Sequence, residues 1–248
     1  MIHYCLIWVS FVHKNIKMQQ RPSIVDIAKI TGFSITTVSR VLNGKADKYR
    51  ISKATQDKIK SAADEMNYVP NEFARNLRSG KSKTIALIVP SLKNPFFAEI
   101  ASAVNTEVRK YGYIMLIGDS DDQIENEKTE LLHLTSRNLD GMIIVPCGDE
   151  WDHLIKVQES GLPLICIDRY FEDANLSHVS SDNYEGAYSA TKYLIEQGHT
   201  DIASIQGIRH STPNIQRVKG FSDAMTDAGI TDYSVTGDAF SEQNGYLE

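Results

Sequence analysis

Apolar positions follow two different patterns along the chain. Between residues 22 and 68, apolar residues recur every three or four positions, as they do along helices that bury one face. From residue 84 onward, short runs rich in Ile, Val and Leu alternate with longer stretches of helical spacing. Such near-continuous apolar runs are typical of strands buried on both faces of a parallel sheet. The pattern therefore predicts an all-α headpiece, residues 22–68, followed by an α/β domain with a parallel sheet, residues 83–248.

The first two helices of the headpiece are predicted to lie close together. Ser23 is a good N-cap, and the apolar spacing that follows it ends at Gly32. Ser34 caps a second helix that ends near Asn43, and Phe33 is apolar enough to fill the angle between the two helices. Two short helices joined by such a tight turn form a helix-turn-helix.

A third helix, capped by Ser52 and continuing to Met66, completes the predicted headpiece. In a helix-turn-helix the second helix enters the major groove of DNA, with its N-terminal residues on the base edges. The candidates for base contacts are therefore Ile35, Thr36, Thr37 and, one turn later, Arg40. The short polar side chains suited to phosphate contacts are Ser34, Thr37, Ser39 and Asn43. The alternative is a generic helical mini-domain.

The charge of the chain is divided unevenly. A net charge of −6 at pH 7 argues against nucleic acid as a partner until the two parts are counted separately. Residues 18–83 carry 13 Lys and Arg against 6 Asp and Glu, a net charge of +7, whereas residues 84–248 carry 11 against 26, a net charge of −15. This asymmetry is typical of a small polyanion-binding unit fused to a domain that does not touch DNA.

The α/β domain alternates predicted strands with predicted helices. The strands are predicted at residues 85–89, 114–117, 141–145, 164–167 and 202–205, with a further strand at 234–237. The helices are predicted at residues 97–111, 125–138, 151–160 and 184–197. Strict alternation of this kind predicts a parallel sheet that is covered by helices on both faces.

Ligands of open parallel sheets bind at the carboxyl ends of the strands, so the side chains there are candidates for a binding site. Those at the predicted strand ends include Phe96 and Phe97 after the first strand, Asp119 and Ser120 after the second, Cys147 after the third, and Asp168 and Arg169 after the fourth. Asp182 and Arg217 are further candidates by their chemistry. Their rings suit an apolar or sugar-like surface, their carboxylates accept from hydroxyl groups, and their guanidinium groups donate in pairs. Other interpretations stay open. Asp168 and Arg169 could form a strand-end ion pair, Phe96 could belong to the core, and Asp182 with Asn183 could cap the next helix.

The sequence contains none of the usual catalytic or metal-binding motifs. Its three cysteines show no CxxC spacing, and its seven histidines are scattered without ligand spacing. Residues 80–82 imitate the end of a P-loop, but Arg75 stands where the first glycine is needed. We therefore expect no enzyme activity, no cofactor and no metal. Cys147 and Cys166 each close a β-branched run, so we expect small buried thiols in a reduced, cytoplasmic compartment.

Several runs of the headpiece occur together in register. They are Asp-Ile-Ala at residues 26–28, Gly-Phe-Ser at 32–34, Thr-Val-Ser-Arg-Val-Leu-Asn at 37–43 and Asn-Tyr-Val-Pro-Asn at 67–71. These runs resemble the DNA-binding headpiece of the lactose-repressor (LacI) family. In that family a hinge helix orders on operator DNA and places a leucine in the minor groove, so the resemblance implies such contacts from Ala74 and Leu77. The loop at residues 43–51 is slightly longer than the commonest family pattern.

The α/β domain carries further runs of this kind. They are Asn-Pro-Phe-Phe-Ala-Glu-Ile at residues 94–100, Leu-Asp-Gly-Met-Ile-Ile at 139–144, Ile-Asp-Arg at 167–169, Asp-Asn-Tyr-Glu-Gly-Ala at 182–187, Gly-His at 198–199 and Arg-Val-Lys-Gly-Phe at 217–221. These runs resemble the periplasmic-binding-protein-like domain of the same family. By that match, an effector is held between two lobes by Phe97, Asp168, Arg169, Asp182 and Arg217.

The resemblance implies a homodimeric transcription regulator, in most family members a repressor, that reads a pseudo-palindromic operator in double-stranded DNA. It implies a small-molecule effector, a sugar or sugar derivative, that changes operator affinity by allostery. Such a protein is cytoplasmic and reaches the nucleoid through its DNA. One rival hypothesis is an exported solute-binding protein, which has no use for a basic headpiece. Another is a non-functional truncated fragment.

The two ends of the sequence and the segment between its domains complete the predicted organisation. The apolar run at residues 6–12 is too short to span a bilayer, so we expect no membrane association, with Met18 as the natural start and residues 1–21 as an unstructured extension. Residues 69–82 are expected to form the hinge helix and linker. Only two strands are predicted in the second lobe, so we expect that lobe to be C-terminally truncated and weakened in stability and effector binding.

Overall fold

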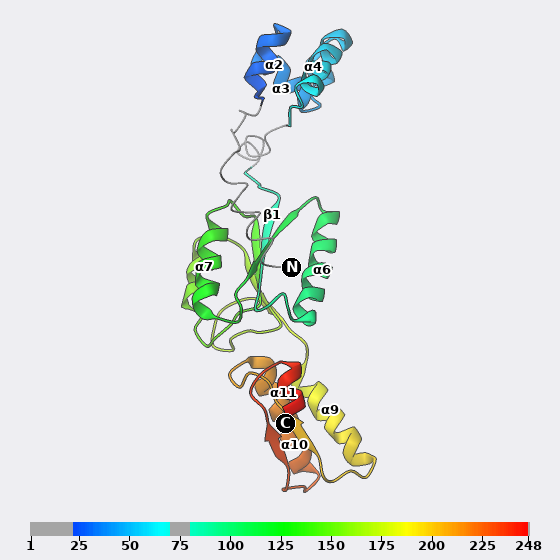
Figure 1. The fold of residues 1–248 in the computed structure, drawn as a ribbon, viewed down its shortest axis with the longest axis vertical. Coiled ribbons are helices and arrows are strands. Elements are labelled where there is room, and N and C mark those ends of the chain that lie inside the picture. Colours follow the sequence, from blue (N-terminus) through cyan, green and yellow to red (C-terminus); the bar gives the residue numbers. More distant parts are fainter. Residues whose placement is uncertain (1–21, 70–79, 248) are drawn as a thin grey trace, which may run out of the picture. The chain divides into compact units, whose positions relative to one another are not determined.

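The computed structural model of the chain describes residues 22–69 and 80–247. The contacts within the chain divide it into two compact units, Met1–Arg75 and Asn76–Glu248. Figure 1 labels the helices of the first unit α2 to α4 and the elements of the second unit from β1 onward. Most of the predicted hinge and linker, together with Ala74 and Leu77, lies outside the described residues.

Three helices form the headpiece: α2 (Ile24–Thr31), α3 (Ile35–Leu42) and α4 (Lys53–Glu65). They confirm the three helices predicted from the sequence. The Ser23 hydroxyl accepts a hydrogen bond from the Asp26 amide, and the Asp26 carboxylate accepts one from the Ser23 amide. This reciprocal capping begins α2, and Gly32 ends it in the left-handed conformation that a residue without a Cβ adopts most easily.

The core of the headpiece lies where the three helices meet. Ile27, Val38 and Ile59, one from each helix, are fully buried there. The stretch between α3 and α4, where the sequence departs from the family pattern, contains a short 3₁₀ helix, Asp47–Tyr49. Ala46 of this stretch is buried in the same core, so the longer loop is anchored to the headpiece.

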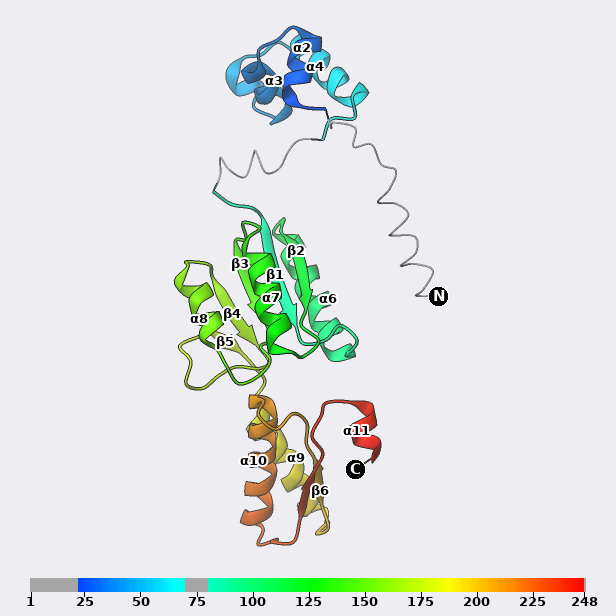
Figure 2. The same ribbon diagram turned by 60° about the vertical axis from the view of Figure 1, so that its left-hand side comes forward.

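The second unit begins with a first lobe built on a five-stranded parallel sheet (Figure 2). The strands are β1 (Thr84–Val89), β2 (Ile114–Asp119), β3 (Gly141–Ile144), β4 (Leu164–Ile167) and β5 (His178–Val179). Their order is β2-β1-β3-β4-β5, and each neighbouring pair is parallel. The structure confirms the first four predicted strands to within two residues. The two-residue strand β5 was not predicted.

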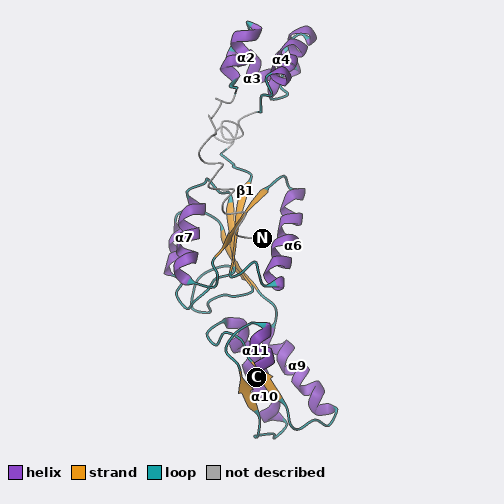
Figure 3. Cartoon of the chain, in the orientation of Figure 1, coloured by secondary structure: helices purple, strands orange, loops and turns teal. Residues whose placement is uncertain are grey.

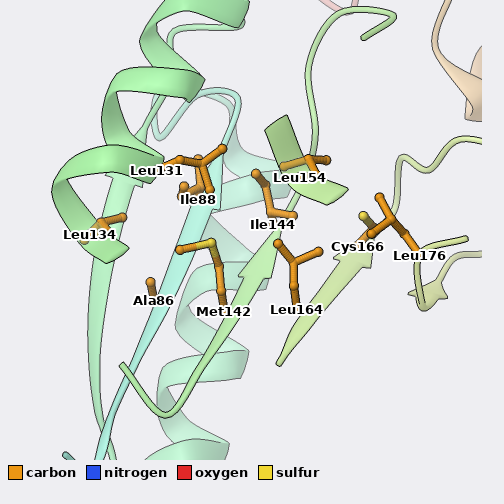
Figure 4. Close-up of a cluster of buried hydrophobic side chains, with 10 residues drawn as sticks. All are labelled: Ala86, Ile88, Leu131, Leu134, Met142, Ile144, Leu154, Leu164, Cys166 and Leu176. Carbon is orange, nitrogen blue, oxygen red and sulfur yellow. The ribbon is translucent and has the colours of Figure 1, made fainter. Parts of the chain in front are cut away.

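Helices cover both faces of this sheet, as predicted. They are α6 (Pro95–Lys110), α7 (Ile124–Thr135) and α8 (Asp152–Glu159), and Figure 3 shows α6 and α7 on opposite sides. Alternate residues of β1 point to opposite faces, so Ile88 packs in the core cluster with Leu131 of α7, shown in Figure 4, while Leu87 packs in the cluster with Phe97 of α6. The carboxyl ends of the strands are thereby held between two rigid layers.

The second lobe contains a two-stranded parallel sheet and three helices. Its elements are α9 (Asn183–Glu196), β6 (Ala203–Ile205), α10 (Thr212–Asp227), β7 (Ser234–Thr236) and α11 (Glu242–Leu247). Both predicted strands and helix α9 are confirmed. The sequence analysis assigned no helix to α10, although Pro213 in its first turn is a common start signal. No helix within residues 22–69 and 80–247 has the length and apolarity needed to cross a membrane.

Helices α9 and α10 pack against each other unusually closely at Gly220. A Cβ atom on Gly220 would lie 2.3 Å from the Tyr184 carbonyl oxygen of α9. Tyrosines of α9 also donate hydrogen bonds across the contact, from Tyr184 Oη to Asp223 at 2.9 Å and from Tyr188 Oη to Asp227 at 2.8 Å. Gly220 is therefore a packing requirement of this lobe.

Both cysteines of the α/β domain are buried free thiols, as predicted. Burial raises the pKa of Cys147 and of Cys166 to about 12, and the charge of Glu127 adds to the rise. In a Cys5→Ser variant at pH 8, we expect both thiols to react with a thiol reagent only as fast as the domain unfolds. Stopped-flow labelling with and without denaturant tests this, and rapid labelling of the native protein would contradict it.

The same pKa shift sets the direction of a pH effect on stability. Because the thiols ionise at a lower pH in the unfolded chain than in the folded one, the unfolded state releases protons first as the pH rises. This contribution to the free energy of unfolding is therefore complete below about pH 8.5 and is lost progressively above it.

Candidate functional site

The N-terminal end of α3 presents an exposed surface. Ile35 is 49% exposed, and Thr36 beside it is also exposed. Ser34 and Thr37 are bonded to each other, because the Ser34 hydroxyl accepts from the Thr37 amide at 3.1 Å and lies 2.9 Å from the Thr37 hydroxyl. Of the predicted base-contacting residues, Ile35 and Thr36 therefore project most freely from the helix.

Arg40, Ser39 and Asn43, the other predicted DNA contacts within the described headpiece, interact with neighbouring residues of the headpiece. The Arg40 guanidinium lies 3.7 Å from the centroid of the Tyr49 ring, a cation–π contact. Asn43 caps α3, and its Nδ2 donates to the Ser39 carbonyl at 2.7 Å and to the Ser39 hydroxyl at 3.2 Å. Tyr49, which the sequence analysis did not single out, therefore orients the one arginine of α3.

Arg169 and Phe97 come together at the carboxyl edge of the first lobe's sheet. Arg169 is only 5% exposed, and its guanidinium lies 5.7 Å from the centroid of the Phe97 ring. Phe97 is buried, whereas Phe96 is 49% exposed and meets the Phe97 ring edge-on at 5.1 Å. Phe96 is therefore not a core residue. This excludes the alternative that the sequence analysis had left open for it.

The partner of Arg169 is an aspartate that the sequence analysis did not identify. Arg169 Nη1 donates to Asp122 Oδ1 at 2.6 Å, and Nη2 donates to Oδ2 at 3.4 Å. Asp122 follows β2, which is not adjacent to the strand that carries Arg169. The alternative of an ion pair between Asp168 and Arg169 is therefore not what the structure shows.

Asp168 lies at the end of β4 with a φ of 62°, a left-handed conformation that aspartate tolerates better than most residues. Burial raises the pKa of its carboxyl, while the positive charges of Arg169 and Arg217 oppose the rise. Arg217 belongs to the second lobe, so candidates from the two lobes act on each other electrostatically.

The two candidates of the second lobe lie along a cavity of about 380 Å³ between α9, β6 and α10. Asp182 caps α9, accepting a hydrogen bond from the Glu185 amide at 3.0 Å, so the capping interpretation holds for it. Arg217 Nε donates to Asn183 Oδ1 at 2.7 Å.

The residues lining this cavity do not include Phe97, Asp168 or Arg169. Arg169 instead lines a smaller pocket with residues of both lobes, among them Tyr170 and Thr212. The candidates thus form two groups, one along this second-lobe cavity and one at the carboxyl ends of the first lobe's strands.

A buried carboxylate holds the loop that follows β3. Glu127 of α7 is fully buried, and its Oε2 accepts from the Cys147 amide at 2.8 Å in the loop that follows β3. Its Oε1 accepts from His153 Nε2 at 2.6 Å. Glu127 lies on the same helix face as the apolar Leu131 and Leu134. A charged residue on that face was the sequence signal for a buried carboxylate.

Two family profiles match this chain. Residues 23–71 match the family described as bacterial regulatory proteins, lacI family. Residues 82–243 match the family described as periplasmic binding proteins and sugar binding domain of LacI family. Together they cover both structural units.

Named relatives agree with these matches. The fructose operon regulatory protein of Vibrio cholerae is 33% identical over 223 residues, which are 89% of this chain and 68% of that protein. The chain spans 61 to 68% of the length of the curated relatives it matches.

Solved structures give the same result. The Cra regulator of Pseudomonas putida, solved with fructose 1-phosphate, is 30% identical, covers 66% of this chain and 62% of its own, and has a TM-score of 0.62. The Lac repressor dimer bound to operator and an anti-inducer covers 92% of this chain and 68% of its own with a TM-score of 0.79. At 23% identity, it supports the fold alone.

Proposed function

This chain belongs to the LacI family of bacterial regulatory proteins, and on that premise we propose that it is a sequence-specific transcription regulator, a repressor of its target genes. It acts by binding and not by catalysis. Its headpieces read a pseudo-palindromic operator in double-stranded DNA, and its α/β domain binds a small sugar-type effector. It works in the cytoplasm, where the DNA is.

The observation that carries this proposal is the exposed N-terminal end of α3 on a basic, independently packed headpiece. The major groove is wide enough to admit an α-helix, and the first residues of α3 present an apolar side chain and a hydroxyl, which suit a thymine methyl group and a base edge. The net charge of +7 over residues 18–83 supplies the phosphate attraction. Ala74 and Leu77 stay predictions for the minor groove.

A homodimer is part of the proposal. One helix of eight residues reads only a few base pairs, so a specific site needs two copies of the headpiece. Strand β2 lies at the edge of the first lobe's sheet and exposes Ile114 and Ile117. An exposed apolar edge strand is a surface that soluble proteins generally cover. A second copy of the chain supplies such a cover.

Effector binding is assigned to the strand-end group, Phe97, Asp168 and Arg169, together with Asp182 and Arg217 of the second lobe. Phe97 lies in the first turn of α6 after β1, and Asp168 and Arg169 directly follow β4, so all three are at the carboxyl edge of the parallel sheet, where ligands of this architecture bind. An effector that contacts both lobes favours one relative arrangement of them. The effector then changes operator affinity by a coupling free energy, and operator binding changes effector affinity by the same amount.

The decisive experiment is selection of operators by the full chain from a random duplex pool, at several salt concentrations. We expect a palindromic winner and a steep fall in affinity with salt. Salt-sensitive binding without any preferred sequence would contradict the proposal, because a basic anchor alone behaves in that way.

A matched pair of isoleucines tests the assigned surface. Ile35 on α3 and Ile30 on α2 are both exposed, at 49% and 65%. We expect Ile35→Ala to weaken binding to the selected operator by about tenfold or more, whereas Ile30→Ala leaves it unchanged. Neither change removes a core contact, so thermal unfolding of the headpiece should be the same in both variants. Equal loss of affinity in the two variants would show that α3 is not the reading helix.

A further inference from the structure

Arg169 is positioned by an acidic group before any ligand arrives. Two of its nitrogens donate to the Asp122 carboxylate, and the side chain is almost fully buried in that position. The positive charge of Arg169 is therefore already neutralised within the protein. A free guanidinium is the usual partner for a phosphate group, because it donates two parallel hydrogen bonds to it, and here that pair of donors is used.

The charges around Arg169 also disfavour a phosphate group. Asp122 is bonded to Arg169, and the charge of Arg169 also acts on Asp168, so two carboxylates share the guanidinium group of Arg169. Asp182 and Arg217 line the separate cavity of the second lobe. Arg217 is also held, through the hydrogen bond from its Nε to Asn183. An excess of carboxylates repels a phosphate dianion but accepts hydrogen bonds from hydroxyl groups.

The aromatic side chains at the same edge complete the chemistry. Phe96 is half exposed and is held edge-on against the buried Phe97 ring. An exposed ring suits the apolar face of a sugar, while carboxylates accept hydrogen bonds from its hydroxyl groups.

We propose that the strand-end site around Arg169 selects an uncharged, hydroxyl-bearing ligand, a free sugar or polyol, over the phosphate ester of the same compound, and that Asp122 sets this preference by occupying Arg169. Asp122 is a positioning residue, because it acts through Arg169. The inference rests on the proposed effector-binding function of this domain.

The test uses the full chain and matched pairs of ligands. The probes are ribose, fructose and glucose, each with its monophosphate ester, and inorganic phosphate alone. Binding is followed by calorimetry and by the shift in thermal unfolding. For the wild-type chain, we expect a free sugar to bind at least about tenfold more tightly than its ester. An ester that binds as tightly as its parent sugar, or more tightly, overturns the proposal.

The variant Asp122→Asn tests the role of Asp122 directly. Asp122 has a φ of 52°, a conformation that asparagine also adopts, so the backbone is preserved while the charge is removed. We expect this variant to gain binding of inorganic phosphate and of the esters by about tenfold or more, since Arg169 is released. Asp122→Gly keeps the same backbone freedom and serves if the first variant does not fold.

Asp121→Asn is the matched control. Asp121 is adjacent, has a φ of 49°, and is exposed, with its nearest cation Lys93 at 3.9 Å. It changes the net charge equally, so it should gain no phosphate binding. Equal gain in both variants, or none in either, overturns the role of Asp122. Phosphate gain by Asp122→Asn without binding of any sugar would support that role and contradict the sugar-type effector of the proposed function.

Discussion

Glu127→Ala is expected to lower the free energy of unfolding of the first lobe by about 3–5 kcal/mol. The carboxylate is fully buried and accepts from both the Cys147 amide and His153 Nε2. Its removal leaves the buried Cys147 amide and the partly buried His153 ring without this partner, and it opens a cavity behind the loop after β3. Trp151 caps α8 and contacts Phe171, so its fluorescence reports on this region. In a Trp8→Phe background it is the only tryptophan, and denaturant unfolding gives the free energy.

The control is Glu127→Gln, which keeps the shape of the side chain and one carbonyl acceptor for the Cys147 amide. We expect it to be clearly less destabilising than Glu127→Ala, since a ring nitrogen of His153 can also accept a hydrogen bond from the new amide. Equal losses in the two variants would mean that the charge, and not the pair of hydrogen bonds, stabilises the loop. A loss below about 1 kcal/mol in Glu127→Ala would contradict the assigned role.

Gly220→Ala is expected to destabilise the second lobe by about 3 kcal/mol or more, at the upper end of the range for overpacking. The added Cβ would lie 2.3 Å from the Tyr184 carbonyl oxygen and 3.0 Å from the Tyr188 amide nitrogen. Both atoms belong to the backbone of α9, so neither can rotate away, and the two helices must separate. Faster amide hydrogen exchange in α9 and α10 is the measurement, and the loss of helix signal on heating confirms it.

Gly186→Ala on α9 is the matched control for this prediction. A Cβ at Gly186 meets no atom within 4 Å, and the residue is exposed in the first turn of α9. We expect this change to stabilise the lobe by about 0.5–1 kcal/mol, because alanine loses less backbone entropy than glycine. Unchanged exchange in Gly220→Ala would show that the helices are not packed as closely as the structure shows.

The headpiece was predictable almost to the residue. Its helix ends depend on Ser23, Gly32 and Ser34, which act on amides and carbonyls within one turn. The first four strands were predictable for a related reason, since a buried parallel strand leaves an apolar run in the sequence. Strand β5 left no such run, because its two exposed residues are a strand only through their pairing with β4.

The candidate site was predictable only in part. Position at a strand end identified Phe97, Asp168 and Arg169, since the carboxyl ends of parallel strands share one edge. The partners of these residues were not predictable in the same way. Asp122 lies in a loop among several acidic residues, and nothing in the local pattern distinguishes it from Asp121. Glu127 was visible as a charge on an apolar helix face, but the groups that it bonds were not.

Short-range patterns in the sequence were enough to specify the helices and most strands. They also specified the division into a basic headpiece and an acidic α/β domain, and the family. Capping and periodicity act over a few residues, so neighbouring residues in the sequence are enough to predict them. The choice of partners at the sheet edge belongs to the tertiary structure. Asp122 and Arg169 are 47 residues apart, and Glu127 and His153 are 26 apart. Such pairs depend on the packing that brings distant strand ends together and on loop conformations, such as the left-handed Asp122, that no periodicity encodes.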